Sequence, residues 1–98
     1  MAASDAFTGN RAIVTVLGSD RSGIVAAVAN TLAQTGTNIL DISQTILQGI
    51  FTMTMLVDLD DSQVSFADLH AQLMQLADEL GVQISMQREE VFKYMYRL

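Results

Sequence analysis

The feature of this sequence that most constrains its fold is the order in which strand-like and helix-like hydrophobic spacings follow each other. Apolar residues at helical spacing mark two segments, about 22–35 and about 65–80. Four short segments, either rich in β-branched residues or strictly alternating, are predicted to be strands. They are RAIVTVLG from Arg11, NILDISQTIL from Asn38, IFTMTMLVDL from Ile50 and VQISMQ from Val82. The predicted order is therefore βαββαβ.

This order predicts an α+β fold, a ferredoxin-like sandwich with a four-stranded antiparallel sheet. Right-handed crossovers place the first and third strands in the centre, the second and fourth at the edges, and both helices on one face. Turn residues support this division of the chain into strands and helices. Gly36 and Gly81 are suited to end the two helices, and Gln48-Gly49 is suited to a hairpin between the second and third strands.

The chain divides into three parts on this interpretation. We expect a flexible lead-in over residues 1–10, one domain over residues 11–88 and a helical tail over residues 89–98. The tail carries two Tyr and a Phe, so it is also a candidate for a clasp between subunits. Its predicted apolar stripe consists of Val91, Met95 and Leu98.

Composition narrows the classes of function. Half of the 98 residues are hydrophobic, which fits one globular domain. The net charge of −6 argues against binding to nucleic acid or anionic lipid, and no apolar run approaches the roughly 20 residues that span a bilayer. The start has no signal-peptide pattern, and the absence of Cys fits a reducing cytoplasm. The single His70 has no partner for a metal, so we expect a cytoplasmic protein without cofactor or membrane contact.

The predicted second strand lacks the usual protection of a sheet edge. No charged residue occurs from Ile42 to Val57, and the chain has no Pro. Edge strands of monomers normally carry a charge or a Pro that prevents pairing with another chain. Either the tail helix or a loop covers this edge, or a second subunit does. We predict a homodimer or higher oligomer, with edge-to-edge pairing and face-to-face packing both open.

Arg21 is the only Lys or Arg between Arg11 and Arg88, and it stands where the first helix begins. A helix N-terminus favours anions, so a cation there gains nothing for the helix, whereas Asp20 and Ser22 suit a cap. Unpaired backbone N–H groups beside a guanidinium suit a carboxylate or a phosphate. The alternative is a solvated Arg21 that pairs with a nearby carboxylate.

The stretch VLGSDRSGIVAAVANTLAQTGTNILDISQT resembles the opening of ACT domains. Asp20-Arg21-Ser22-Gly23-Ile24 is similar to the Asp-Arg-(Pro or small)-Gly-apolar loop of that family, with Ser22 where many members have Pro. Gly36-Thr37-Asn38-Ile39 is similar to the Gly-x-Asn-Ile start of the second strand. The predicted element order is also that of ACT domains, so the resemblance covers about residues 11–87. The aromatic tail resembles the small stand-alone ACT proteins of bacteria and archaea.

The resemblance implies a regulatory domain without catalytic residues or a metal, which binds a small amino acid between two subunits. One subunit would supply the loop and the partner would supply polar groups of the second strand. Carried over, the ligand-binding residues are Asp20, Arg21, Ser22, Gly23, Asn38 and, less directly, Asp41. Asn38 also suits a strand start, Asp41 a solvated edge, and Arg21 a salt bridge between subunits. The signal would pass through oligomerisation or to a separate metabolic enzyme or regulator.

Two other functions compete with the sensor. Acylphosphatases share this fold and use a loop Arg with an Asn, which Arg21 and Asn38 superficially match, although the sequence lacks the rest of that family's motifs. A ligand-free protein-interaction or oligomerisation module is the other. RNA binding of the RRM type would need aromatic residues on the central strands and a basic surface, but the first strand has no aromatic residue, the third has only Phe51, and the chain is acidic. The identity of the amino acid and of the regulated pathway is not encoded in any pattern of the sequence.

Overall fold

A computed structural model describes residues 10–19 and 21–95, apart from the side chains of Arg21 and Met95. The elements are β1 (Arg11–Gly18), α2 (Arg21–Gln34), β2 (Asn38–Leu47), β3 (Ile50–Asp58), α3 (Phe66–Leu80), β4 (Gln83–Arg88) and α4 (Glu89–Met95). The strand order is β2-β3-β1-β4, with antiparallel neighbours throughout. The predicted ferredoxin-like sandwich with a short C-terminal helix is confirmed, including the central position of β1 and β3.

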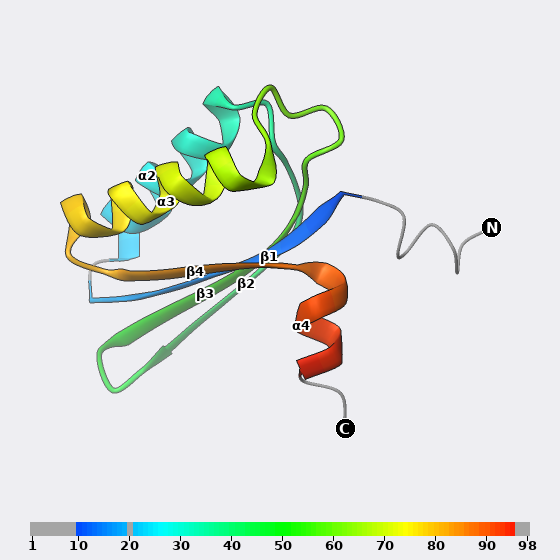
Figure 1. The fold of residues 1–98 in the computed structure, drawn as a ribbon. Coiled ribbons are helices and arrows are strands. Elements are labelled where there is room, and N and C mark those ends of the chain that lie inside the picture. Colours follow the sequence, from blue (N-terminus) through cyan, green and yellow to red (C-terminus); the bar gives the residue numbers. More distant parts are fainter. Residues whose placement is uncertain (1–9, 20, 96–98) are drawn as a thin grey trace.

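Two helices cover one face of the sheet. Figure 1 shows α2 and α3 side by side above the strands, with α4 below them. We call the covered side the helix face and the other the open face. Alternation of side chains assigns residues to these faces, because every second residue of β1 and β3 is buried. The buried strand residues are Ala12, Val14, Val16, Phe51, Met53, Met55, Val57, Ile84 and Met86, and they pack with Ile24, Val28, Leu32, Leu69 and Leu73 of the helices.

The predicted helix ends and the predicted hairpin are confirmed. The Ser65 side chain accepts a hydrogen bond from the backbone N–H of Asp68 at 3.1 Å, which caps α3. Gly36 and Gly81 follow α2 and α3 with φ of 73° and 70°, the left-handed conformation that ends a helix. Gln48-Gly49 joins β2 to β3 with φ of 52° and 82°, as a two-residue hairpin turn requires.

Strand register fixes which parts of the chain share an end of the sheet. Gly18 lies opposite Phe51, and Phe51 lies opposite Ile46. The start of α2, which follows β1 directly, is therefore at the hairpin end of β2. Asn38 lies opposite Asp58 at the other end. Eight residues at about 3.3 Å each separate Asn38 from Ile46, or roughly 26 Å along the strand.

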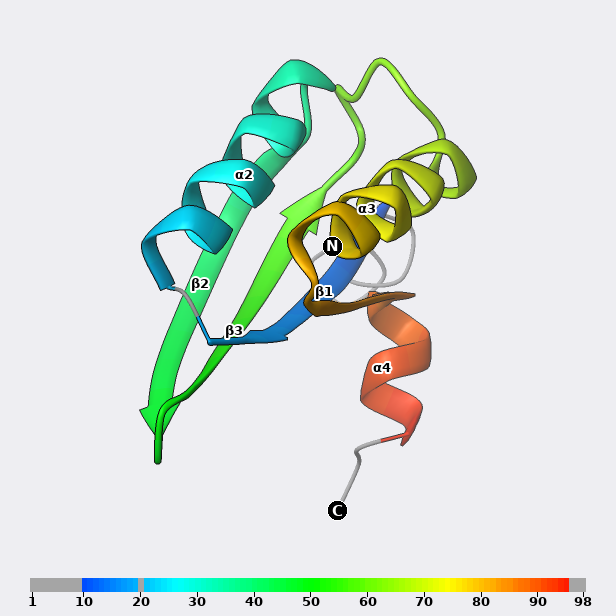
Figure 2. The same ribbon diagram turned by 90° about the vertical axis from the view of Figure 1, so that its left-hand side faces the viewer.

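β2 is an edge strand that is exposed along its whole length. Large apolar side chains on it are 36–70% exposed, namely Ile39, Leu40, Ile42, Ile46 and Leu47. The tail helix does not cover them, because α4 packs against β1 and β4 at the far side of the sheet (Figure 2). The tail helix over residues 89–95 therefore does not protect this edge within one chain.

The tail helix is held by an ion pair that the sequence did not indicate. The Arg11 guanidinium donates from Nε to Glu89 Oε1 at 2.9 Å and from Nη2 to Oε2 at 2.8 Å. The Glu89 side chain is only 5% exposed, and Lys93 Nζ lies 3.5 Å from the same Oε2. Val91, predicted to be on a buried stripe, is 46% exposed because α4 meets the sheet mainly through this anchor. Leu98 of that stripe lies outside the described residues.

Removal of this anchor is expected to destabilise the fold. Arg11→Met should lower the free energy of unfolding by about 2 kcal/mol, because it leaves a buried carboxylate without its two charge-assisted hydrogen bonds. Lys93→Met is the matched control, with an expected change of at most about 0.5 kcal/mol, because the Lys93 side chain is 53% exposed and forms an i, i+4 pair. Urea unfolding measures both. Equal, small effects of the two changes would show that the Arg11–Glu89 pair contributes no net stability.

Candidate functional site

A short loop joins β1 to α2, and at its start the backbone of Gly18 lies close to the side chains of Val82 and Ile24. A Cβ atom on Gly18 would stand 2.7 Å from Cγ1 of Val82 and would also collide with Ile24. Any larger residue here would force the Val82 and Ile24 side chains to shift, so glycine suits the end of β1 with α2 directly above. This approach places the N-terminus of α2 over the hairpin end of β2.

A hollow of about 420 Å³ lies between the first turns of α2 and the edge strand. It is lined by Ser22, Val25 and Ala26 of α2 and by Gln44 of β2. Gln44 lies opposite Met53, which is buried against the helices, so its side chain is on the helix face. The hollow thus combines a helix N-terminus, small or apolar side chains and one carboxamide that can both donate and accept hydrogen bonds.

The structure brings together only part of the predicted site. Ser22 and Gly23 are exposed in the first turn of α2. Asp20 and the Arg21 side chain lie outside the described residues, although the Arg21 backbone begins α2. Within one chain Asn38 does not meet this loop, since it is exposed at the far end of β2. Its role in a shared site stays a prediction.

Asp41 is also separated from the loop, because it lies on the other face of β2. The register that the hairpin sets places Asp41 opposite Leu56, and a bulge at Leu40 shifts only the residues before it, so that Ile39 lies opposite Val57. Asp41 is therefore on the open face. Its Oδ1 accepts a hydrogen bond from the backbone N–H of Ile42 at 2.9 Å. The carboxylate borders a hollow of about 190 Å³ on the open face, away from α2.

Sequence reasoning missed Gln44, and the signal that would have found it is alternation. In the stretch from Ile42 to Ile46 the first, third and fifth residues share a face. Gln44 stands between two isoleucines on that face. Gln44 is the polar side chain in this apolar row and is the β2 residue that lines the hollow beside the start of α2. Its place opposite Met53 follows from the register that the hairpin sets.

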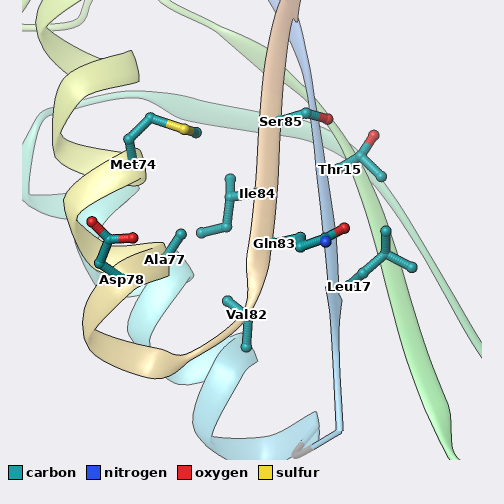
Figure 3. Close-up of a pocket in the computed structure, with 9 residues that line it drawn as sticks. All are labelled: Thr15, Leu17, Met74, Ala77, Asp78, Val82, Gln83, Ile84 and Ser85. Carbon is teal, nitrogen blue, oxygen red and sulfur yellow. The ribbon is translucent and has the colours of Figure 1, made fainter.

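A second hollow, also about 420 Å³, surrounds the other edge strand, β4 (Figure 3). Met74, Ala77 and Asp78 of α3 lie on one side of the β4 backbone, and Thr15 and Leu17 of β1 lie on the other. Asp78 is the only charged residue in its lining. This hollow disfavours a carboxylate ligand, because it offers negative charge and no cation among the described residues.

No group of three or more metal-binding side chains occurs within residues 10–19 and 21–95. His70 instead stacks on Phe66 with ring centroids 6.3 Å apart. None of the helices in these ranges is long and apolar enough to span a bilayer.

A ferredoxin-like sandwich with a hollow at a helix N-terminus, next to an unpaired edge strand, defines the class of small regulatory ligand-binding domains. The ACT domain model matches residues 10–87, and the chain belongs to the ACT domain family. Related proteins match this chain over nearly its whole length. The UPF0237 protein of Methanocaldococcus jannaschii is 49% identical over 89 residues, which are 91% of this chain and 99% of that protein.

Solved structures show the same fold. An ACT domain protein from Streptococcus pneumoniae is 41% identical with a TM-score of 0.75, and the match covers 90% of this chain and 99% of that one. A candidate glycine cleavage system transcriptional repressor is 26% identical with a TM-score of 0.71, and the match covers 81% of this chain and 45% of that one. The family assignment implied by the DRSGI and GTNI motifs is thereby confirmed.

Proposed function

We propose that this protein is a non-catalytic cytoplasmic sensor that binds a small amino acid, or a similar carboxylate, at the interface of a homodimer. The observation that supports the proposal most directly is the hollow between α2 and β2. It lies at a helix N-terminus and at the one sheet edge that is both apolar and exposed. A ligand there would contact the part of the surface through which a second subunit would join.

The chemistry of the hollow suits an amino acid of modest size. N–H groups at the start of α2, with the Arg21 guanidinium, would bind the α-carboxylate. Val25 and Ala26 offer apolar contact to a short aliphatic side chain. The Gln44 carboxamide oxygen can accept a hydrogen bond from the ammonium group. In this arrangement Gln44 takes the role that the resemblance gave to Asn38 and Asp41, because those two lie on the open face.

A thermal-shift screen against the twenty amino acids and acetyl phosphate tests the proposal. A ligand at 100 times its Kd stabilises the folded state by about 2.7 kcal/mol. For a domain of this size that raises Tm by at least about 10 °C. We expect such a shift with one or two amino acids. A shift with acetyl phosphate alone would favour the acylphosphatase alternative, and no shift with any compound would favour a ligand-free interaction module.

A steric variant locates the binding site. Ala26→Phe should fill the hollow and weaken binding more than tenfold, while the fold is retained because Ala26 is exposed. Ala33→Phe is the matched control, since it is exposed on the same helix two turns further from the hollow. Isothermal titration measures both affinities. Unchanged affinity in Ala26→Phe would place the ligand elsewhere.

A further inference from the structure

The second edge of the sheet, β4, is also open. Among the residues that the structure describes, no strand pairs with the outer side of β4. No charged residue occurs from Gly81 to Gln87, and the chain has no Pro, so the usual protection of a sheet edge is absent here too. The outward backbone N–H and C=O groups of β4 can therefore form hydrogen bonds with another extended strand.

The hollow around β4 has the form that an added strand would fill. Figure 3 shows Met74, Ala77 and Asp78 of α3 on one side of the β4 backbone and Thr15 and Leu17 of β1 on the other. The space thus follows the outer edge of the strand and extends to both faces of the sheet. A strand beside β4 would have α3 against one of its faces and would continue the open face of the sheet with the other.

Alternation in β4 determines which side chains would meet an added strand. Ile84 is 8% exposed on the helix face, whereas Gln83 and Ser85 are exposed on the open face. Residues directly opposite each other on neighbouring strands share a face. The residue opposite Ile84 would therefore pack near Met74 and Ala77 and should be apolar. The residues opposite Gln83 and Ser85 should be polar, and a hydroxyl residue suits both positions.

Charge indicates what else an added strand should carry. Residues 63–87, which include α3 and β4, contain three carboxylates and no Lys or Arg. One of them, Asp78, is exposed and is the only charged residue in the lining of the hollow. It is four residues before Val82, which packs against the core just before β4 begins. A Lys or Arg opposite Val82 would extend along the helix face toward this carboxylate.

The same charges disfavour a second copy of this chain at the β4 edge. Pairing of β4 with its counterpart would place the Asp78 carboxylates of both copies at one seam. It would also bring two acidic flanks together in a protein whose net charge is −6. The β4 edge therefore favours a partner with positive charge.

We propose that β4 is a docking edge for an extended segment of a partner protein. In this segment apolar and hydroxyl residues alternate, and a Lys or Arg occupies the position opposite Val82. The segment runs antiparallel to β4, as all neighbouring strands of this sheet do, so its cation is near its C-terminal end. The regulatory meaning rests on the sensor function proposed above, since the segment would belong to the protein that receives the signal. β4 and β2 are opposite edges, so a partner and a second subunit can bind together.

An NMR titration of the isotope-labelled full chain tests the docking edge, without any amino acid present. The probe is the peptide acetyl-Thr-Val-Thr-Val-Thr-Lys-amide, whose valines would lie opposite Met86 and Ile84 and whose Lys would lie opposite Val82. Backbone amide signals of residues 82–88 should shift, and those of β2 should not. A matched peptide with Glu in place of Lys should bind about threefold more weakly or worse, as expected for an exposed ion pair. No shift of the β4 signals at millimolar peptide, or shifts at β2 instead, would overturn the proposal.

Two charge variants test the position of the cation. Asp78→Asn should abolish the preference for the Lys peptide over the Glu peptide. Glu79→Gln is the matched control, because Glu79 is the next residue but borders a separate hollow between α2 and α3, and it should retain the preference. A preference that persists in Asp78→Asn would overturn the proposed register.

One further measurement separates the possible occupants of the β4 edge. If the β4 signals shift with protein concentration in the absence of peptide, a second copy occupies this edge and the proposal is wrong. If they stay constant, the edge is free for a partner. Since no amino acid is used, failure to bind amino acids in the thermal-shift screen would refute the sensor function separately from docking.

Discussion

Phe51→Ala is expected to lower the free energy of unfolding by about 3–5 kcal/mol, the range for loss of a buried aromatic side chain. Phe51 is 2% exposed and is among the largest fully buried side chains. It lies opposite Gly18, which has no side chain to fill the space that truncation would leave. Total stabilities of small domains are about 5–15 kcal/mol. The substitution should therefore remove a large share of the stability and lower Tm by more than about 12 °C.

Ile50→Ala is the matched control for Phe51→Ala. Ile50 is the preceding residue of β3 and is 55% exposed, so its truncation should change the free energy of unfolding by less than about 1 kcal/mol. Urea unfolding of both variants measures the contrast. Similar losses at the two positions would mean that Ile50 is buried in solution by a second subunit, or that Phe51 is less tightly packed than the structure indicates.

The fold could be predicted from sequence because local signals agreed with each other. Strand and helix periodicities did not overlap, and each boundary had its own residue, such as Ser65 at the start of α3 and Gly81 at its end. Right-handed crossovers then left one arrangement of βαββαβ. These are short-range rules, so one sequence was sufficient to apply them.

The candidate site was predicted less completely because it depends on register. A hairpin of fixed length aligns β2 with β3 and places Asp41 on the open face opposite Leu56, whereas the bulge at Leu40, which no turn residue indicates, shifts Ile39 and Asn38. Gln44 enters the site only through that alignment. The Arg11–Glu89 pair was missed for a similar reason, because 78 positions separate its partners and their meeting follows from the position of β1 beside β4.

Uncharged sequence proved more informative about the site than charged sequence. Attention to Arg21 located the N-terminus of α2, but the absence of charge from Ile42 to Val57 located the exposed edge. Both features meet at Gln44, on the surface where the proposed interface and the hollow coincide. In a sheet edge, the residues that prevent association are usually charged, so their absence from Ile42 to the end of β2 favours a partner.

Arg21→Ala is expected to weaken amino acid binding at least tenfold with little effect on folding. A hydrogen bond to a charged group contributes about 1.5–3 kcal/mol, and about 1.4 kcal/mol corresponds to a factor of ten in Kd. Arg88→Ala is the matched control with the same change in charge. Arg88 lies far from α2, with its guanidinium 4.4 Å from the centroid of the Phe66 ring, and its loss should leave affinity unchanged.

Isothermal titration and sedimentation of the Arg21→Ala variant distinguish its two possible partners. If Arg21 binds the carboxylate of the ligand, affinity falls while the dimer persists. If Arg21 forms a salt bridge between subunits, the dimer dissociates. In that case a ligand that still binds the monomer would retain its affinity. The second result would remove Arg21 from the binding site and leave the N–H groups of α2 as its only anion-binding element.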